Sequence, residues 1–207
     1  MQINSKILNH VKKWTSPDET KERIVQEALH LFYTQGYSNT GINQLLEEAG
    51  VFRKSFYTHF SGKEELGTEY LRAQDKSYIG YMRAMMEKYS DTQDFIHGWA
   101  AMLIRNSKAR KFVGCPFSNF AGQTLDQTEY FGKTLNEIMN NWKNELANYF
   151  SMATFRGRPL KSGDSQDLAV RFLTCYEGLV QLYITMKEPK YLVRLEKDLE
   201  KILEEYY

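Results

Sequence analysis

Residues 40–66, TGINQLLEEAGVFRKSFYTHFSGKEEL, decide the fold of this chain. Their pattern predicts two short helices joined by a tight turn at Gly50, followed by the start of a longer helix. We expect Thr40 to cap the first of these helices. The second is only about two turns long, which is too short for a helix to be stable alone. Its inner side, formed by Phe56 and Phe60, must therefore pack against the rest of the segment.

The longer helix is expected to begin with a capping box that pairs Ser61 with Glu64. A similar capping box at Ser16 predicts the start of an earlier helix, which is expected to end at Gly36. Farther on, helical spacing predicts helices to about residue 89, from 91 to about 110 and from 125 to 150. A short helix or turn is expected through Phe120, a loop at 156–165, and two last helices on either side of Pro189. The sequence thus predicts an all-α fold with three parts. These are a tail (1–15), a head (16–66) of three helices whose helix-turn-helix spans about 40–60, and a larger helical C-terminal domain (67–207).

The second helix of the helix-turn-helix presents cations, hydroxyls and rings outward: Arg53, Lys54, Ser55, Tyr57, Thr58 and His59. This mixture suits a helix that enters a DNA groove. Yet residues 1–66 hold eight Lys/Arg and eight Asp/Glu, and the whole chain has a formal net charge of +1. Affinity for DNA must therefore come from a few cations that reach phosphates, because the chain has no general positive charge.

The composition excludes several classes of protein. With 42% hydrophobic and 26% charged residues, the 207-residue chain is globular rather than disordered. It has no apolar run long enough to span a bilayer and no signal peptide. Its two cysteines are too few for a disulfide framework. We therefore expect a cytoplasmic protein. No catalytic constellation emerges, and the four histidines make no metal-ligand spacing with the cysteines. We therefore expect no enzyme activity, metal or cofactor.

The penultimate helix is apolar on nearly all sides, so other helices must pack against two opposite sides of it. One side can pack on its own subunit, whereas the other indicates a partner. We therefore predict a homodimer in which the last two helices of each chain form a four-helix bundle across a two-fold axis. A central core helix in a monomer remains the alternative. The predicted interface residues are Leu168, Phe172, Cys175, Leu179, Leu182, Leu195 and Leu199.

Cys115 has two interpretations. It follows Gly114 at a helix break, a few positions after three cations. Nearby cations lower the pKa of a thiol, so in the first interpretation Cys115 is a sensor of electrophiles. In the other interpretation Cys115 is a small buried residue at a tight turn.

An ordered set of residues runs through the head: Ile24, Ala28, Leu31, Phe32, Gly36, Tyr37, Thr40, Ile42, Ala49-Gly50-Val51, Ser55-Phe56-Tyr57, His59-Phe60, Lys63-Glu64 and Leu66. On these residues the span from about Glu19 to Leu66 resembles the DNA-binding domain of the TetR/AcrR family of transcriptional regulators. Farther on, Gly114-Cys115 with Asn119 is similar to the mid-chain GC-x-x-x-N element of one subgroup of that family.

The resemblance implies roles for residues of the head. Three of them would hold phosphates: Thr40, Tyr57 and Lys63. Five would approach base edges: Phe52, Arg53, Lys54, Ser55 and His59. In the family a small polar cap is usual at position 52, and glycine or alanine is common at position 54. These two departures leave the operator sequence open.

The resemblance also implies the function of a homodimeric repressor that binds a palindromic DNA operator and is released by a small hydrophobic, aromatic or electrophilic effector. The effector pocket would lie in the C-terminal domain. Candidate lining residues are Tyr70, Trp99, Met102, Cys115, Phe117, Phe120, Trp142, Tyr176 and Tyr183. Two other functions remain open. One is a transcriptional activator with the same fold, and the other is an all-α ligand-binding protein or enzyme without specific DNA binding.

Overall fold

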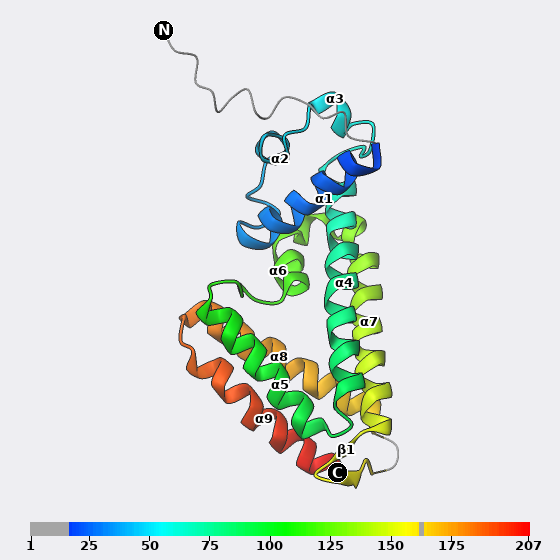
Figure 1. Ribbon diagram of the computed structural model, residues 1–207, viewed down its shortest axis with the longest axis vertical. Helices are drawn as coiled ribbons and strands as arrows, with labels where there is room; N and C mark the ends of the chain where they lie inside the picture. Colours follow the sequence, from blue (N-terminus) through cyan, green and yellow to red (C-terminus); the bar gives the residue numbers. More distant parts are fainter. Residues whose placement is uncertain (1–16, 162–163) are drawn as a thin grey trace. The chain divides into compact units, whose positions relative to one another are not determined.

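A computed structural model describes residues 17–161 and 164–207, and within them helices dominate (Figure 1). The predicted all-α fold class is confirmed. The predicted tail and the Ser16 cap lie outside the described residues.

The chain divides into two compact units, residues 1–73 and residues 74–207. The first unit contains α1 (Pro17–Thr34), α2 (Ile42–Ala49), α3 (Arg53–Phe56) and the beginning of α4 (Lys63–Lys88). The second contains the rest of α4, α5 (Thr92–Lys108), α6 (Pro116–Gln123), the 3-10 turn η2 (Leu125–Gln127), α7 (Thr128–Met152), β1 (Thr154–Phe155), β2 (Arg158–Pro159), α8 (Ser165–Met186) and α9 (Lys190–Tyr206). The division therefore falls inside α4, a few residues beyond the boundary expected at Leu66.

In the first unit α1, α2 and α3 pack on one another. Gly36 and Gly50 take the left-handed backbone conformation, with φ of 97° and 61°, which turns the chain after α1 and after α2. The rings of Phe56 and Phe60 are buried 5.4 Å apart, as the sequence predicts for the inner side of the helix-turn-helix.

Two capping predictions were wrong. Gly41, not Thr40, is the N-cap of α2, and the buried Thr40 hydroxyl donates to the Gly36 carbonyl at 2.8 Å. At the start of α4, Ser61 pairs with Glu65 rather than Glu64, since Oε2 of Glu65 accepts from the Ser61 amide at 2.7 Å and from its hydroxyl at 2.8 Å. Because α4 begins at Lys63, Glu65 is the third helical residue, from which a capping carboxylate reaches back.

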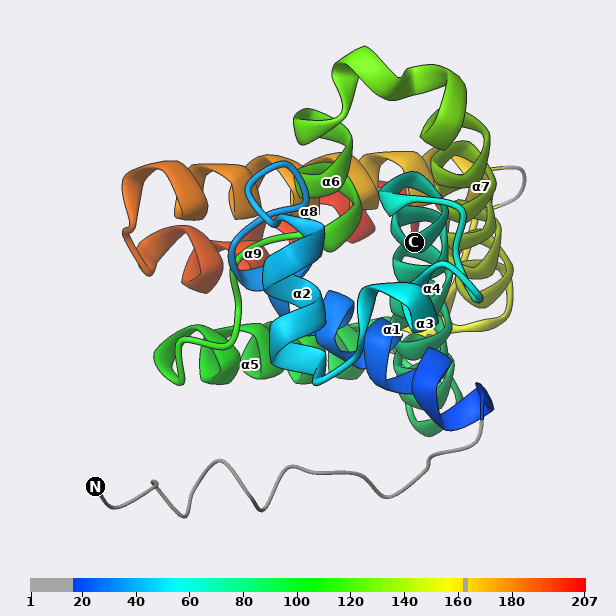
Figure 2. The ribbon, with the colours of Figure 1, turned by 90° about the horizontal axis from the view of Figure 1, so that it is seen from above.

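In the second unit α8 packs against α7 and α9, and α8 and α9 lie side by side in Figure 2. Helix α5 also packs against α9. Aromatic rings fill the space between α5, α7 and α8. Trp99 stacks on Phe172 with centroids 5.1 Å apart, and Phe95 lies 5.0 Å from the ring of Tyr149. Of these four rings, Trp99 also borders the cavity described below.

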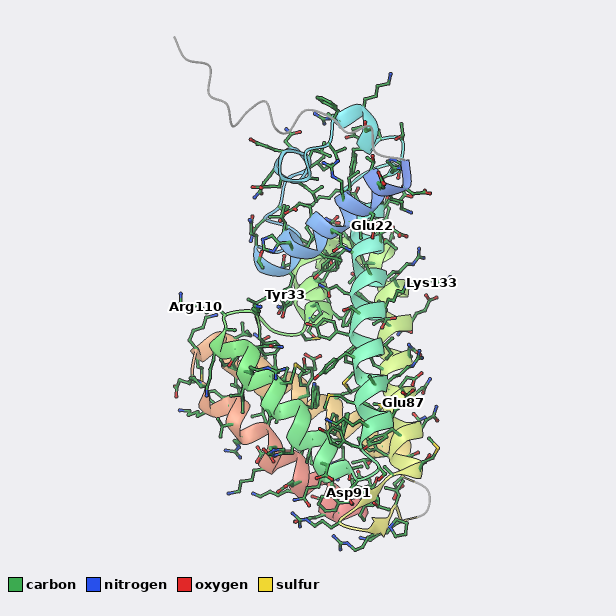
Figure 3. The ribbon with its side chains drawn as sticks, viewed as in Figure 1. Glu22, Tyr33, Glu87, Asp91, Arg110 and Lys133 are labelled. Atoms are coloured by element: carbon green, nitrogen blue, oxygen red, sulfur yellow. The ribbon has the colours of Figure 1, made fainter. Side chains whose placement is uncertain are left out.

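The strand pair replaces part of the loop expected at 156–165. Arg156 and Gly157 both have positive φ, 52° and 75°, as the two-residue turn of a tight hairpin requires. Asp91, labelled in Figure 3, ties this hairpin to the start of α5: its carboxylate accepts from the Gly157 amide and from the Thr154 hydroxyl, each at 3.1 Å.

Burial changes the predicted dimer surface. Leu168, Phe172, Leu195 and Leu199 are each 0% exposed within their own chain and Leu179 is buried as well, so assigning them to a partner-facing side was wrong. The reason is that a helix facing its own core repeats every three or four residues, just as a coiled-coil seam does. Of the predicted set, Leu182 is exposed and Cys175 is half-buried. The other exposed large apolar residues of α8 and α9 are Val170, Met186 and Val193.

Candidate nucleic-acid interface and ligand cavity

The surface around α3 gathers most of the predicted base-edge residues. Phe52 is 69% exposed, Arg53 and Lys54 are exposed, and Ser55 and His59 are half-buried. The helix is a single turn, shorter than predicted, and Phe52 as its N-cap makes no side-chain hydrogen bond to the helix amides. The turn that follows α3 continues the same segment, since the Thr58 hydroxyl donates to the Ser55 carbonyl at 2.6 Å.

The cations of α3 are not engaged by carboxylates. Neither Arg53 nor Lys54 makes an ion pair within the described part of the chain. The Arg53 guanidinium carbon lies 5.8 Å from the ring centroid of the half-exposed Tyr57. Both charges are therefore available to phosphates or to guanine edges, which is what paired hydrogen bonds from arginine or lysine to guanine require.

Lys63 is the first residue of α4 and is held by an aromatic ring. Its ammonium lies 4.2 Å from the ring centroid of Tyr37, and burial lowers the pKa of its amine. A cation over a ring face is attracted by the ring quadrupole, so Lys63 is oriented before any ligand binds. Thr40 differs, because its hydroxyl is buried and already donates to Gly36, which removes it from the set of phosphate contacts.

Arg23 also supports this surface, although it was not among the residues selected from the sequence. Its guanidinium Nη2 donates to the carbonyls of Ala49 and Gly50, the second at 3.1 Å, and so ties the end of α2 to α1. Unsatisfied carbonyls at a helix end need such partners. The position of Arg23, directly before the buried Ile24, could have been noticed in the sequence. Its hydrogen-bond acceptor at Ala49, 26 residues away, could not have been predicted from that position.

The second unit contains a cavity of about 290 Å³. Four predicted lining residues border it: Trp99, Met102, Trp142 and Tyr176. Its other lining residues, missed from the sequence, are Ser77, Tyr78, Tyr81, Met82, Leu103, Arg105, Asn106 and Phe112. Most of these lie on α4 and α5 at steps of three or four around Tyr78 and Trp99, a spacing that gave a usable signal.

The remaining predicted lining residues lie elsewhere. Phe117 and Phe120 are buried in the core, where Phe117 packs on Trp142 and Phe120 on Phe131. Tyr183 stacks on Phe112, and Tyr70 belongs to the first unit, where its ring packs on Phe32. These residues and Cys115 do not line the cavity, which corrects the predicted set.

Cys115 is the N-cap of α6 and is only 5% exposed. Burial, and then the negative charge of Glu177, raise the pKa of its thiol to about 12. The GC-x-x-x-N element is a structural turn: Gly114 has a φ of 110°, and Asn119 Nδ2 donates to the Val113 carbonyl at 2.8 Å. The geometry favours the buried-residue interpretation over the reactive thiolate.

Neither a metal site nor a membrane span is found in residues 17–161 and 164–207. No group of three or more His, Cys, Asp or Glu side chains gathers there as metal ligands, and none of the helices there has both the length and the apolarity to cross a bilayer.

Comparison with known proteins bears on the head and on the whole chain. Residues 24–69 match the family described as bacterial regulatory proteins, tetR family. The chain is 32% identical over 127 residues to the HTH-type transcriptional regulator LmrA of Bacillus subtilis, covering 60% of this chain and 67% of LmrA. It is 26% identical over 182 residues to the HTH-type transcriptional regulator YxaF of the same organism, covering 84% of this chain and 90% of YxaF.

A solved structure supports the same fold over nearly the whole chain. A TetR-family transcriptional regulator from Cytophaga hutchinsonii matches with a TM-score of 0.81 and 17% identity, covering 94% of this chain and 98% of that one.

Proposed function

The chain belongs to the TetR family of bacterial regulatory proteins, and on this basis we propose that it is a homodimeric repressor released from a palindromic operator by a small-molecule effector. As a helix-turn-helix member of the family, it is a DNA-binding transcriptional regulator. Repression, the homodimer, the effector and a cytoplasmic location are the proposed part, as is the division into a DNA-binding head and a domain for ligand and dimer.

The observation that carries the proposal is the pair of cations Arg53 and Lys54, which make no ion pair with the residues that the structure describes. They lie on an exposed turn whose inner side, Phe56 and Phe60, is buried. We assign phosphate contacts to Tyr57 and Lys63. Approach to base edges is assigned to the exposed or half-buried residues around α3, namely Phe52, Arg53, Lys54, Ser55 and His59. Phosphate contacts set the position on DNA, and only contacts to base edges carry sequence information.

The proposed release is geometric. Two copies of α3 enter successive major grooves only when they are spaced by about 34–36 Å, one turn of DNA. The single helix α4 carries Lys63 in its first turn and the cavity residues Tyr78 and Met82 farther along, so a ligand that moves α4 acts on the head. The ligand must prefer the released state, since equal affinity for both states shifts nothing. A coupling of about 1–3 kcal/mol corresponds to a change of about 5- to 150-fold in DNA affinity.

Selection of genomic fragments bound by the protein, followed by titration of the enriched site, tests the DNA-reading assignment. Lys63→Ala should weaken binding to every sequence and reduce the salt slope by about one, because one phosphate contact is lost. Arg53→Ala should cost about 1–3 kcal/mol and should also relax preference at one base pair. Lys133→Ala, an exposed cation on α7, is the matched control and should change neither.

Unchanged affinity and salt slope in Lys63→Ala would remove its phosphate assignment. Transcription in vitro from the selected site then separates repression from activation. Stimulation by the protein without effector would show an activator and overturn the proposed repressor.

A further inference from the structure

The cavity of the second unit has an unbalanced charge. Among the described residues that line it, Arg105 is the only charged one, and no carboxylate faces it. A neighbouring groove between α4 and α5 shares Tyr81, Met102 and Arg105 with the cavity and adds Lys88, again without a carboxylate. The exposed Arg105 therefore lies where the cavity meets the groove, and the charged residues that line these two are all cations. Arg105 also borders a separate surface depression, which Lys108 and Glu196 line with it.

Arg105 differs from the arginines of the second unit that carboxylates hold, whereas Arg110 and Arg158 likewise make no ion pair among the described residues. Arg83 pairs with Glu145 at 2.5 Å, Arg156 with Glu204 at 2.8 Å and Arg171 with Glu205 at 2.6 Å. The guanidinium of Arg105 makes neither an ion pair nor a hydrogen bond within residues 17–161 and 164–207. A free guanidinium presents a planar set of donors that matches a carboxylate with two parallel hydrogen bonds.

The walls of the cavity are aromatic on two sides. Trp99 and Tyr176 lie with ring centroids 4.7 Å apart, and Tyr78 and Trp142 with centroids 6.1 Å apart. The indole N–H of Trp142 donates to Asp75 at 2.9 Å, so that only the ring of Trp142 is left for a ligand. Such walls select flat ring systems, because stacked or edge-on rings are favoured over other contacts.

We propose that the effector is a planar aromatic acid, whose rings lie between these walls and whose carboxylate or phenolate pairs with Arg105. The neighbouring Asn106 supplies an amide whose Nδ2 donates, within the described part of the chain, to the weak acceptor Met102 Sδ at 3.1 Å. A cavity of about 290 Å³ is near the lower limit of small-molecule sites, which suits two or three rings. An aromatic cation is disfavoured, because its charge would be desolvated beside Arg105 without a carboxylate partner. This inference rests on the proposed function only in taking the cavity as the effector site.

Three probes with the same rings and different charge test the proposal: 2-naphthoate, 2-naphthamide and 2-naphthylmethylammonium. Calorimetric titration of the full chain should show naphthoate binding about five- to tenfold more tightly than the amide, since a hydrogen bond gains strength when a charge assists it. The ammonium should bind most weakly. In Arg105→Ala the preference for naphthoate should fall to within about twofold while the affinity for the amide is retained, because the ring contacts remain. Arg105→Lys should keep part of the preference.

Lys108→Ala is the matched control, since Lys108 lies one turn farther along α5 and shares only the separate depression with Arg105, not the cavity or the groove. It should bind all three probes as the wild-type chain does. Equal binding of the three probes by the wild-type chain overturns the charge preference, although release of DNA by all three would still support the effector cavity. A preference that survives in Arg105→Ala overturns the role of Arg105. Failure of all three to bind a chain that still binds its operator overturns the aromatic acid and leaves the regulator intact.

Discussion

The thiol of Cys115 lies at the N-terminus of α6, where burial and the carboxylate of Glu177 both oppose its ionisation. With a pKa of about 12, the thiolate fraction at pH 8 is about a thousandfold below that of a thiol with a pKa of 9. Alkylation of Cys115 by iodoacetamide at pH 8, followed by peptide mass mapping, should therefore be about a thousandfold slower in the folded chain than in urea. Equal rates would restore the sensor hypothesis.

The same shift predicts a pH dependence of stability. The folded-state pKa of Cys115 is raised from 9.0 to about 12, so its stabilising contribution is fully present below pH 9 and is lost as pH rises from 9 to 12. Urea unfolding at pH 8 and pH 10 should show that the advantage of the wild-type chain over Cys115→Ser shrinks at the higher pH. An advantage that is constant or grows would contradict the burial of a neutral thiol.

At the scale of elements, the turn between α2 and α3 depends on a side chain from α1. Arg23 donates to the last carbonyls of α2, and a Cβ at Gly50, whose φ is 61°, would lie 2.9 Å from Arg23 Nη2 and displace that guanidinium. Arg23→Ala should lower the free energy of unfolding by about 1–2 kcal/mol. It should weaken DNA binding without changing the salt slope, since Arg23 positions α3 and is not assigned a phosphate. Gln26→Ala, an exposed neutral residue of α1, is the control for urea unfolding and anisotropy titration.

At the scale of the whole molecule, the proposed dimer must use the apolar residues of α8 and α9 that the chain leaves exposed. Leu182 is 42% and Val193 60% exposed. Leu182→Glu and Val193→Glu should each shift the protein from dimer to monomer in sedimentation and weaken binding to a two-half-site operator, because a buried charge at an interface has no partner. Leu125→Glu, at an exposed apolar residue of η2, should remain dimeric. Dimers that persist in both α8 and α9 variants would place the interface elsewhere.

The sequence predicted the helices well and their ends poorly, for a physical reason. Long stripes such as Leu192, Leu195 and Leu199 repeat over several turns, so one irregular residue does not hide the period. A cap depends on which residue starts the first turn, and a shift of one residue exchanged Glu64 for Glu65. The hairpin was missed because each of its strands has only two residues.

The residues of the candidate DNA interface could be predicted from the sequence, whereas those of the cavity could be predicted only in part. The exposed residues of α3 follow one another in the chain, so local pattern was enough to select them. Within α4 and within α5 the lining residues follow helical spacing, but that Tyr78 of α4 and Arg105 of α5 border one cavity depends on the tertiary structure, which no local pattern encodes. The seam on α8 was ambiguous because core and interface stripes share one spacing, and only the 0% exposure of Leu168 and Phe172 assigns them to the core.

The placement of the indoles has an optical consequence. Of the three tryptophans in the sequence, Trp99 and Trp142 both line the cavity. One is stacked on Phe172, and the other is hydrogen-bonded to Asp75. Indole emission depends on stacking and on the polarity of its surroundings, so the protein carries its own reporter of cavity occupancy. Quenching or a colour shift that differs between Trp99→Phe and Trp142→Phe would tell which wall a bound molecule touches, without any attached dye.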